Sequence, residues 1–137
     1  MKLITRDTDY SIRALCYIAK SKGKVVSVPE LTSQLRVPKP FLRSALQVLG
    51  KKGILISTKG IGGGFRLAKP AEKIFLLDLF NIFQGKFSLN DCLLKKIACP
   101  HKGACFLKKK IDRIERFALS ELKGVTIASL LKHSKRS

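Results

Sequence analysis

The segment ILISTKGIGGGFRL, residues 54–67, decides the predicted fold. Its first five residues are rich in β-branched side chains, and Phe65-Arg66-Leu67 can form the returning strand. The glycines between them permit positive φ angles and a close approach of the backbone to another surface. The segment therefore predicts a β-hairpin with a glycine-rich turn. A phosphate-binding P-loop is not expected, because no Gly-Lys-Ser/Thr ending and no helix follow.

Two short helices are predicted just before this hairpin. Ser27-Val28-Pro29-Glu30 is a capping box with proline in the first turn, and the helix should run to about Leu35. A turn at Val37-Pro38 leads to a second helix, whose apolar face comprises Phe41, Leu42, Ala45, Leu46 and Leu49. Its polar face presents long hydrogen-bond donors: Lys39, Arg43, Ser44 and Gln47. A helix-turn-helix followed by a hairpin predicts a winged helix.

A helix is also expected near the N-terminus. Thr8 or Asp9 can cap it, and its apolar face comprises Ile12, Leu15, Cys16 and Ala19. Cys16 is therefore predicted to pack in the core and not to bind a ligand.

The charge of the chain points to a polyanionic partner. The 137 residues carry a net charge of +19, from 28 Lys and Arg against 9 Asp and Glu. Nucleic acid is the first candidate and an acidic membrane the second. We expect no signal peptide and no bilayer-spanning helix, which places the chain in the cytoplasm, where thiols stay reduced.

The C-terminal half is predicted to be helical. Ile74–Phe83 is an apolar run that should form a buried helix ending at Gly85. A long helix should follow from Phe106 to Leu122, with Leu107, Ile111, Ile114, Ala118 and Leu122 forming an apolar seam. This seam would pair with its copy in a second subunit or pack back on its own domain. Thr126 can cap a last short helix through Leu131.

The expected fold is mostly α with one small β-hairpin. It divides into a winged-helix domain (residues 1–85), a cysteine segment (residues 86–105) and a dimerisation helix with a short helix after it (residues 106–137).

Three of the four cysteines, Cys92, Cys99 and Cys105, follow a C-x6-C-x5-C pattern. Such clustering suits a metal or iron–sulfur site, a redox site or a disulfide, the last disfavoured in the cytoplasm. His101 could complete a zinc site with these thiolates, although the C-x2-C spacing typical of zinc knuckles is missing. Cys99 close to His101 does not make a catalytic pair, since closeness in sequence is not catalytic geometry. We do not expect an enzyme.

Several stretches resemble winged-helix transcription regulators typified by IscR and NsrR. They are residues 40–55, the wing motif KGIGGGFRLA at 59–68, Leu77-Asp78 with Gly85, and the three downstream cysteines. The resemblance implies a homodimer that binds palindromic double-stranded promoter DNA. It also implies an iron–sulfur cluster, [2Fe–2S] or [4Fe–4S], held by Cys92, Cys99 and Cys105.

The fourth ligand and the DNA contacts are also implied by this resemblance. IscR-like members have a histidine where Lys108 stands, whereas NsrR-like members use an N-terminal aspartate of the other subunit, which corresponds to Asp9. Asp9 is therefore preferred over His101. Major-groove contacts are expected from Lys39, Arg43, Ser44 and Gln47, and wing contacts from Lys59, Gly62 and Gly63. The predicted function is a repressor or activator that senses iron–sulfur status, nitric oxide or redox state; the alternative is a DNA-binding protein with a structural zinc site.

Overall fold

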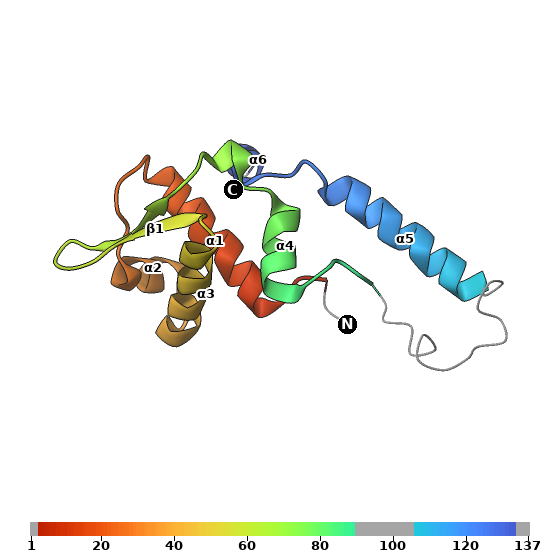
Figure 1. Ribbon diagram of the computed structural model, residues 1–137, viewed down its shortest axis with the longest axis horizontal. Helices are drawn as coiled ribbons and strands as arrows, with labels where there is room; N and C mark the ends of the chain where they lie inside the picture. The colour runs from red at the N-terminus through yellow and green to blue at the C-terminus, as the bar shows by residue number, and fades with distance from the viewer. Residues whose placement is uncertain (1–2, 90–105, 134–137) are drawn as a thin grey trace.

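The computed structural model describes residues 3–89 and 106–133. Its elements are α1 (Arg6–Lys20), α2 (Val28–Leu35), α3 (Lys39–Lys51), β1 (Leu55–Thr58), β2 (Gly64–Leu67), η1 (Ala71–Lys73), α4 (Leu76–Gln84), α5 (Phe106–Leu122) and α6 (Ile127–His133). Figure 1 shows a body built on α1, with the hairpin at one end and α5 at the other. The predicted winged helix is confirmed, and none of the described helices is long and apolar enough to cross a bilayer.

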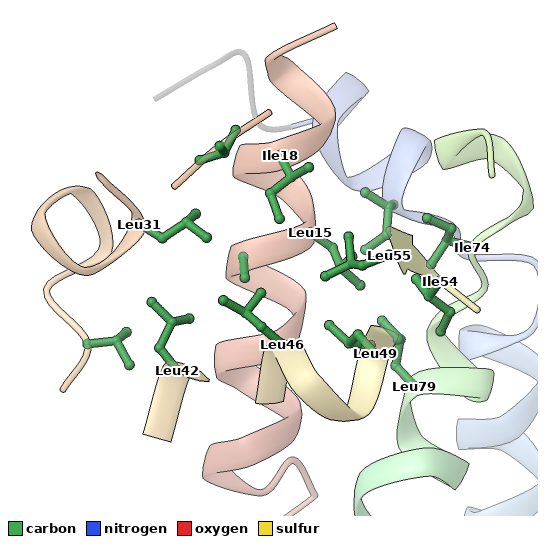
Figure 2. Close-up of a cluster of buried hydrophobic side chains, with 14 residues drawn as sticks. Leu15, Ile18, Leu31, Leu42, Leu46, Leu49, Ile54, Leu55, Ile74 and Leu79 are labelled. Atoms are coloured by element: carbon green, nitrogen blue, oxygen red, sulfur yellow. The ribbon is translucent and has the colours of Figure 1, made fainter. Parts of the chain in front are cut away.

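The main core lies around α1, which contacts α2, α3, α4, α6 and the hairpin (Figure 2). Its wholly buried members include Leu15, Leu31, Leu46, Leu79 and Ile127. Because Ile127 belongs to α6, the last helix is part of the winged-helix core. The Thr126 hydroxyl accepts a hydrogen bond from the Ser129 amide (3.1 Å), which is the predicted cap. Cys16 is half-buried against this core, and burial raises the pKa of its thiol, as expected for a packing residue.

The start of α1 differs from the prediction. The cap is Thr5, one turn before the expected Thr8 or Asp9. The Thr8 hydroxyl is buried and donates to Gln84 Oε1 at 2.7 Å, while Asp9 pairs with Arg13 Nε at 3.1 Å. Gln84 Oε1 also accepts from the Thr5 amide (3.0 Å), so the end of α4 holds the first turn of α1.

The hairpin is joined to the rest of the domain through Val26. Its strands are antiparallel, with Leu55 opposite Leu67. Val26 and Phe65 exchange two backbone hydrogen bonds of 2.8 Å, which connect Val26 to strand β2 as an isolated β-bridge. Gly64 lies directly against this bridge, and a Cβ there would collide with the backbone carbonyl of Val26.

This contact predicts different effects on stability for two glycine-to-alanine changes. Gly64→Ala should lower the free energy of unfolding by about 1–3 kcal/mol, because the backbone of Val26 must shift. Gly50→Ala is the matched control, since Gly50 lies in α3 and a Cβ added to it would meet no atom within 4 Å. The control should be neutral or more stable by up to about 1 kcal/mol. Urea unfolding followed by circular dichroism measures both; equal effects would contradict the proposed contact.

A second, smaller core joins α4 to α5. Its buried members are Leu76, Phe80 and Phe87, and the rings of Phe80 and Phe87 have centroids 6.0 Å apart. The partly buried residues against it include Ala118, Leu119 and Leu122 of α5. The Leu89 amide also donates to the Glu115 carboxylate at 2.9 Å.

The apolar seam predicted for α5 is therefore divided. Ala118 and Leu122 pack on their own domain, as the intrachain alternative expected. Leu107 and Ile114 remain 68% and 53% exposed, and Phe106 and Phe117, which the sequence pattern missed, are 73% and 65% exposed. These last four residues form what we call the α5 apolar surface.

Candidate DNA-binding surface

The helix-turn-helix is built largely by local interactions. The Ser27 hydroxyl accepts from the Glu30 amide (3.2 Å), as in the predicted capping box. The Glu30 carboxylate accepts from the Tyr17 hydroxyl of α1 (2.7 Å), which fixes α2 against α1 and raises the pKa of Tyr17. Helix α2 ends at Leu35, and the left-handed conformation of the next residue, Arg36 (φ 55°), turns the chain toward α3.

Helix α3 buries one face and exposes the donors of the other. Leu42, Ala45, Leu46 and Leu49 are buried. Lys39, Arg43, Ser44 and Gln47 are all exposed, as predicted. Phe41 was predicted on the apolar face but is 40% exposed, at the edge of the helix. The guanidinium of Arg6 covers its ring at 4.2 Å from the centroid, which supplies part of the missing packing.

A cleft of about 750 Å³ separates α3 from the hairpin. Five of the predicted DNA-contacting residues line it: Lys39, Arg43, Gln47, Lys59 and Gly63. Ser44 and Gly62 are exposed but are not among the lining residues. The cleft also contains Lys51, and none of its lining residues is acidic. A basic cleft between a helix and a hairpin is suited to the phosphate backbone on either side of a DNA groove.

The start of α2 opens into the same cleft, a feature that the sequence pattern did not reveal. Ser27, Val28 and Pro29 line its wall. The positive end of the helix dipole favours an anion at such a place, although Pro29 has no N–H and the Glu30 amide is bonded to the Ser27 hydroxyl. The capping box was the signal that could have identified it, because it marks where the helix begins.

Gly63 has a structural reason to be glycine. Its amide donates to the Gly60 carbonyl (3.0 Å), and a Cβ would collide with the Thr58 carbonyl oxygen. The glycine therefore closes the turn of the wing, and its contact with DNA stays a prediction.

Asp9 lies apart from this cleft, on the first turn of α1. Its side chain is 42% exposed and is beside a hollow of about 500 Å³ that Arg6, Arg13 and Arg36 also line. Lys108, which occupies the place of the IscR-type histidine, pairs with Asp112 at 2.8 Å within α5. The predicted ligands Cys92, Cys99 and Cys105, and the alternative His101, lie outside the described residues. Within the described ranges, no three His, Cys, Asp or Glu side chains are grouped to hold a metal ion.

Known proteins are similar to this chain in sequence and in fold. The family model of Rrf2, described as an iron-dependent transcriptional regulator, matches residues 4–133. The chain belongs to the Rrf2 family of transcriptional regulators. A candidate HTH-type transcriptional regulator of Aquifex aeolicus (strain VF5) is 32% identical over 124 residues, covering 89% of this chain and 86% of that protein. Protein aau3 of Rhizobium meliloti (strain 1021) is 31% identical over 130 residues, covering 94% and 84%.

Solved structures share the fold of this chain. CymR, the global cysteine regulator of B. subtilis, superposes with a TM-score of 0.79 at 20% identity, covering 97% of this chain and 98% of that one. IscR of T. potens superposes with a TM-score of 0.68 at 23% identity, covering 98% and 89%. Similarity at this level shows the fold alone. Because Rrf2 proteins are transcriptional regulators, the prediction that the chain is not an enzyme is confirmed.

Proposed function

We propose that this Rrf2 protein is a cytoplasmic homodimeric regulator that binds promoter DNA in the basic cleft and senses its signal through an iron–sulfur cluster. The observation that carries the DNA-binding part is the cleft between α3 and the hairpin. Helix α3 would enter the major groove with Arg43 and Gln47 near base edges, and Lys59 would reach the adjacent minor groove. The positive end of the α2 dipole, at Ser27, would favour a phosphate between these two groove contacts.

The two-fold dimer is supported by the α5 apolar surface. Phe106, Leu107, Ile114 and Phe117 lie on the helix that projects furthest from the core (Figure 1). Exposed aromatic and aliphatic side chains gathered on one side of a helix often mark a protein interface. In such a dimer, each subunit would cover the α5 apolar surface of the other. The two copies of α3, the recognition helix, would then face the two halves of a palindromic site.

The donor set fits an iron–sulfur cluster by its chemistry. Cys92, Cys99 and Cys105 would supply three thiolates, the ligands that such clusters prefer. Asp9 would supply the fourth ligand to the other subunit. Its exposed ion pair with Arg13 contributes only about 0–1 kcal/mol, so releasing the carboxylate costs little. When bound, the cluster would supply a centre that reacts with oxidants and nitric oxide.

Contacts at both ends of the cysteine segment support its coupling to DNA binding. On one side, Gln84 at the end of α4 binds Thr5 and Thr8 of α1. Arg6, in the same turn, stacks on Phe41 of α3. On the other side, Leu89 is bonded to Glu115 of α5. A rearrangement of residues 90–105 would therefore act on the start of α1, and through Arg6 on the first turn of the recognition helix.

Replacing Arg43 tests the DNA-binding part. We expect Arg43→Ala to weaken binding to a duplex selected by the wild-type protein from a random pool by about tenfold or more, because a bidentate contact to a base is lost. Arg116→Ala is the matched control, since Arg116 is an exposed arginine on α5, outside the cleft. Fluorescence anisotropy measures the affinity. Equal affinity of both variants, or a wild-type affinity that does not fall with salt, would contradict the proposed cleft.

A further inference from the structure

One large apolar side chain on the hairpin has no packing role. Ile61 has a relative exposure of 109%, the highest of the large hydrophobic residues described. The apolar side chains with the next highest exposures belong to the α5 apolar surface, at the other end of the molecule from the hairpin turn (Figure 1). The dimer proposed above would therefore leave Ile61 uncovered.

The turn is built to present this one side chain. Residues 60 and 62–64 are all glycine, so Ile61 is the only side chain between Lys59 and Phe65. Gly60 and Gly62 on either side have φ angles of +94° and +76°. The hydrogen bond from the Gly63 amide to the Gly60 carbonyl closes the turn under it. The result is a slender tip with bare backbone on both sides of a branched apolar group.

We propose that Ile61 is an apolar wedge that enters the minor groove of the bound DNA. The inference rests on the DNA-binding function proposed above and assigns a contact to the tip of the wing. The B-DNA minor groove is about 6 Å wide, which admits a glycine-flanked tip but not a broad loop. Isoleucine is among the side chains that other proteins place against unstacked base steps in this groove.

The neighbouring residues give this wedge its position. Lys59 and Gly60 line the basic cleft. Ile61 is the next residue of the protein, so it follows directly after the segment that would run along the DNA phosphates. Lys59, at the minor groove, would neutralise the DNA phosphates that border it, and Ile61 would displace water from the sugar and base edges. The two contributions differ in their salt dependence, because only the cation releases counterions.

The test uses the full-length protein and the duplex selected from a random pool. Ile61→Ala should weaken binding about tenfold, because burial of the branched side chain is lost. The affinity of Ile61→Ala should depend on salt as the wild-type affinity does. For Lys59→Ala, the slope of log affinity against log salt concentration should become smaller in magnitude by about 0.9. Ile61→Leu should recover most of the affinity. Ile56→Ala is the matched control: Ile56 is an isoleucine of the same hairpin, 38% exposed on β1.

A modified duplex locates the contact in the groove. Replacing single adenines by 2,6-diaminopurine adds an amino group in the minor groove and leaves the major groove unchanged. At the base pairs under the wing, this change should weaken DNA binding by the wild-type protein and have little effect on DNA binding by Ile61→Ala. The wedge is wrong, while the DNA-binding function stands, if Ile61→Ala binds DNA as tightly as Ile56→Ala. The same holds if the modified base pairs weaken DNA binding by Ile61→Ala as much as they weaken binding by the wild-type protein. If the wild-type protein selects no duplex at all, both proposals fail.

Discussion

The double replacement Phe117→Glu with Ile114→Glu is expected to convert the protein from a dimer to a monomer. These side chains are 65% and 53% exposed on α5 and would face their copies across a two-fold axis. Four carboxylates would then be brought together in an apolar interface, where unpaired charges are costly. We expect the dimer dissociation constant to rise by roughly a hundredfold or more, which corresponds to about 2.7 kcal/mol or more.

Sedimentation of the wild-type and variant proteins over a range of concentrations measures this change. Arg116→Glu is the control, because it adds a carboxylate at an exposed position of the same helix outside the α5 apolar surface. The control should stay dimeric. The double variant should also bind DNA more weakly, because a monomer brings only one copy of α3 to each complex. A wild-type protein that is monomeric at all concentrations would contradict the proposed role of α5.

Removal of any one of the three clustered cysteines is the second large change. We expect Cys92→Ala, Cys99→Ala and Cys105→Ala each to abolish iron, sulfide and visible absorption in the anaerobically purified protein. Losing one of three thiolates leaves the remaining donors too few to hold a cluster firmly. Cys16→Ala is the matched control, because Cys16 is half-buried in α1 with a thiol pKa raised by burial. It should keep its full content of iron and sulfide.

The same preparations test whether the cluster acts on DNA. The affinity of the wild-type protein for its selected duplex should change by about tenfold when the cluster is removed, a size typical of coupling between two sites. Asp9→Ala should keep the fold but lose the cluster faster in air. One zinc and no sulfide per chain would favour the structural zinc site instead. A colourless protein that cannot be reconstituted, with cysteine variants that bind DNA unchanged, would refute the sensor.

Local sequence signals located most of the winged helix. The capping serine at 27 and the glycine-rich turn act over a few residues, so α2 and the hairpin were predictable without knowing the rest of the fold. The start of α1 was not, because Thr8 is directed inward by Gln84, which lies 76 residues away. Periodicity likewise placed Phe41 in the core, whereas this ring is 40% exposed at the edge of α3 with the Arg6 guanidinium stacked on it.

Helix α5 shows the same limit at the candidate interface. Its periodicity placed one seam along Leu107, Ile114 and Ala118. The packed side of the helix is instead set by Leu76 and Phe80 of α4 together with Phe87 and Leu89. The last two lie in a segment without a helical pattern. The exposed surface is rotated away from that contact and includes Phe117. In contrast, the exposed positions of the α3 donors followed from helical spacing alone, because each donor needs only to avoid the buried face of the helix.

A hydroxyl-radical footprint on the selected duplex tests the central claim most directly. Two copies of α3 in successive major grooves predict two symmetric protected half-sites, with centres separated by about one helical turn or a multiple of it. Minor-groove protection under the wings should be lost in Lys59→Ala, and the pattern should disappear in the Phe117→Glu and Ile114→Glu variant. A single asymmetric protected patch, or protection that is unchanged in both variants, would contradict DNA binding by a dimer through the α3–hairpin cleft.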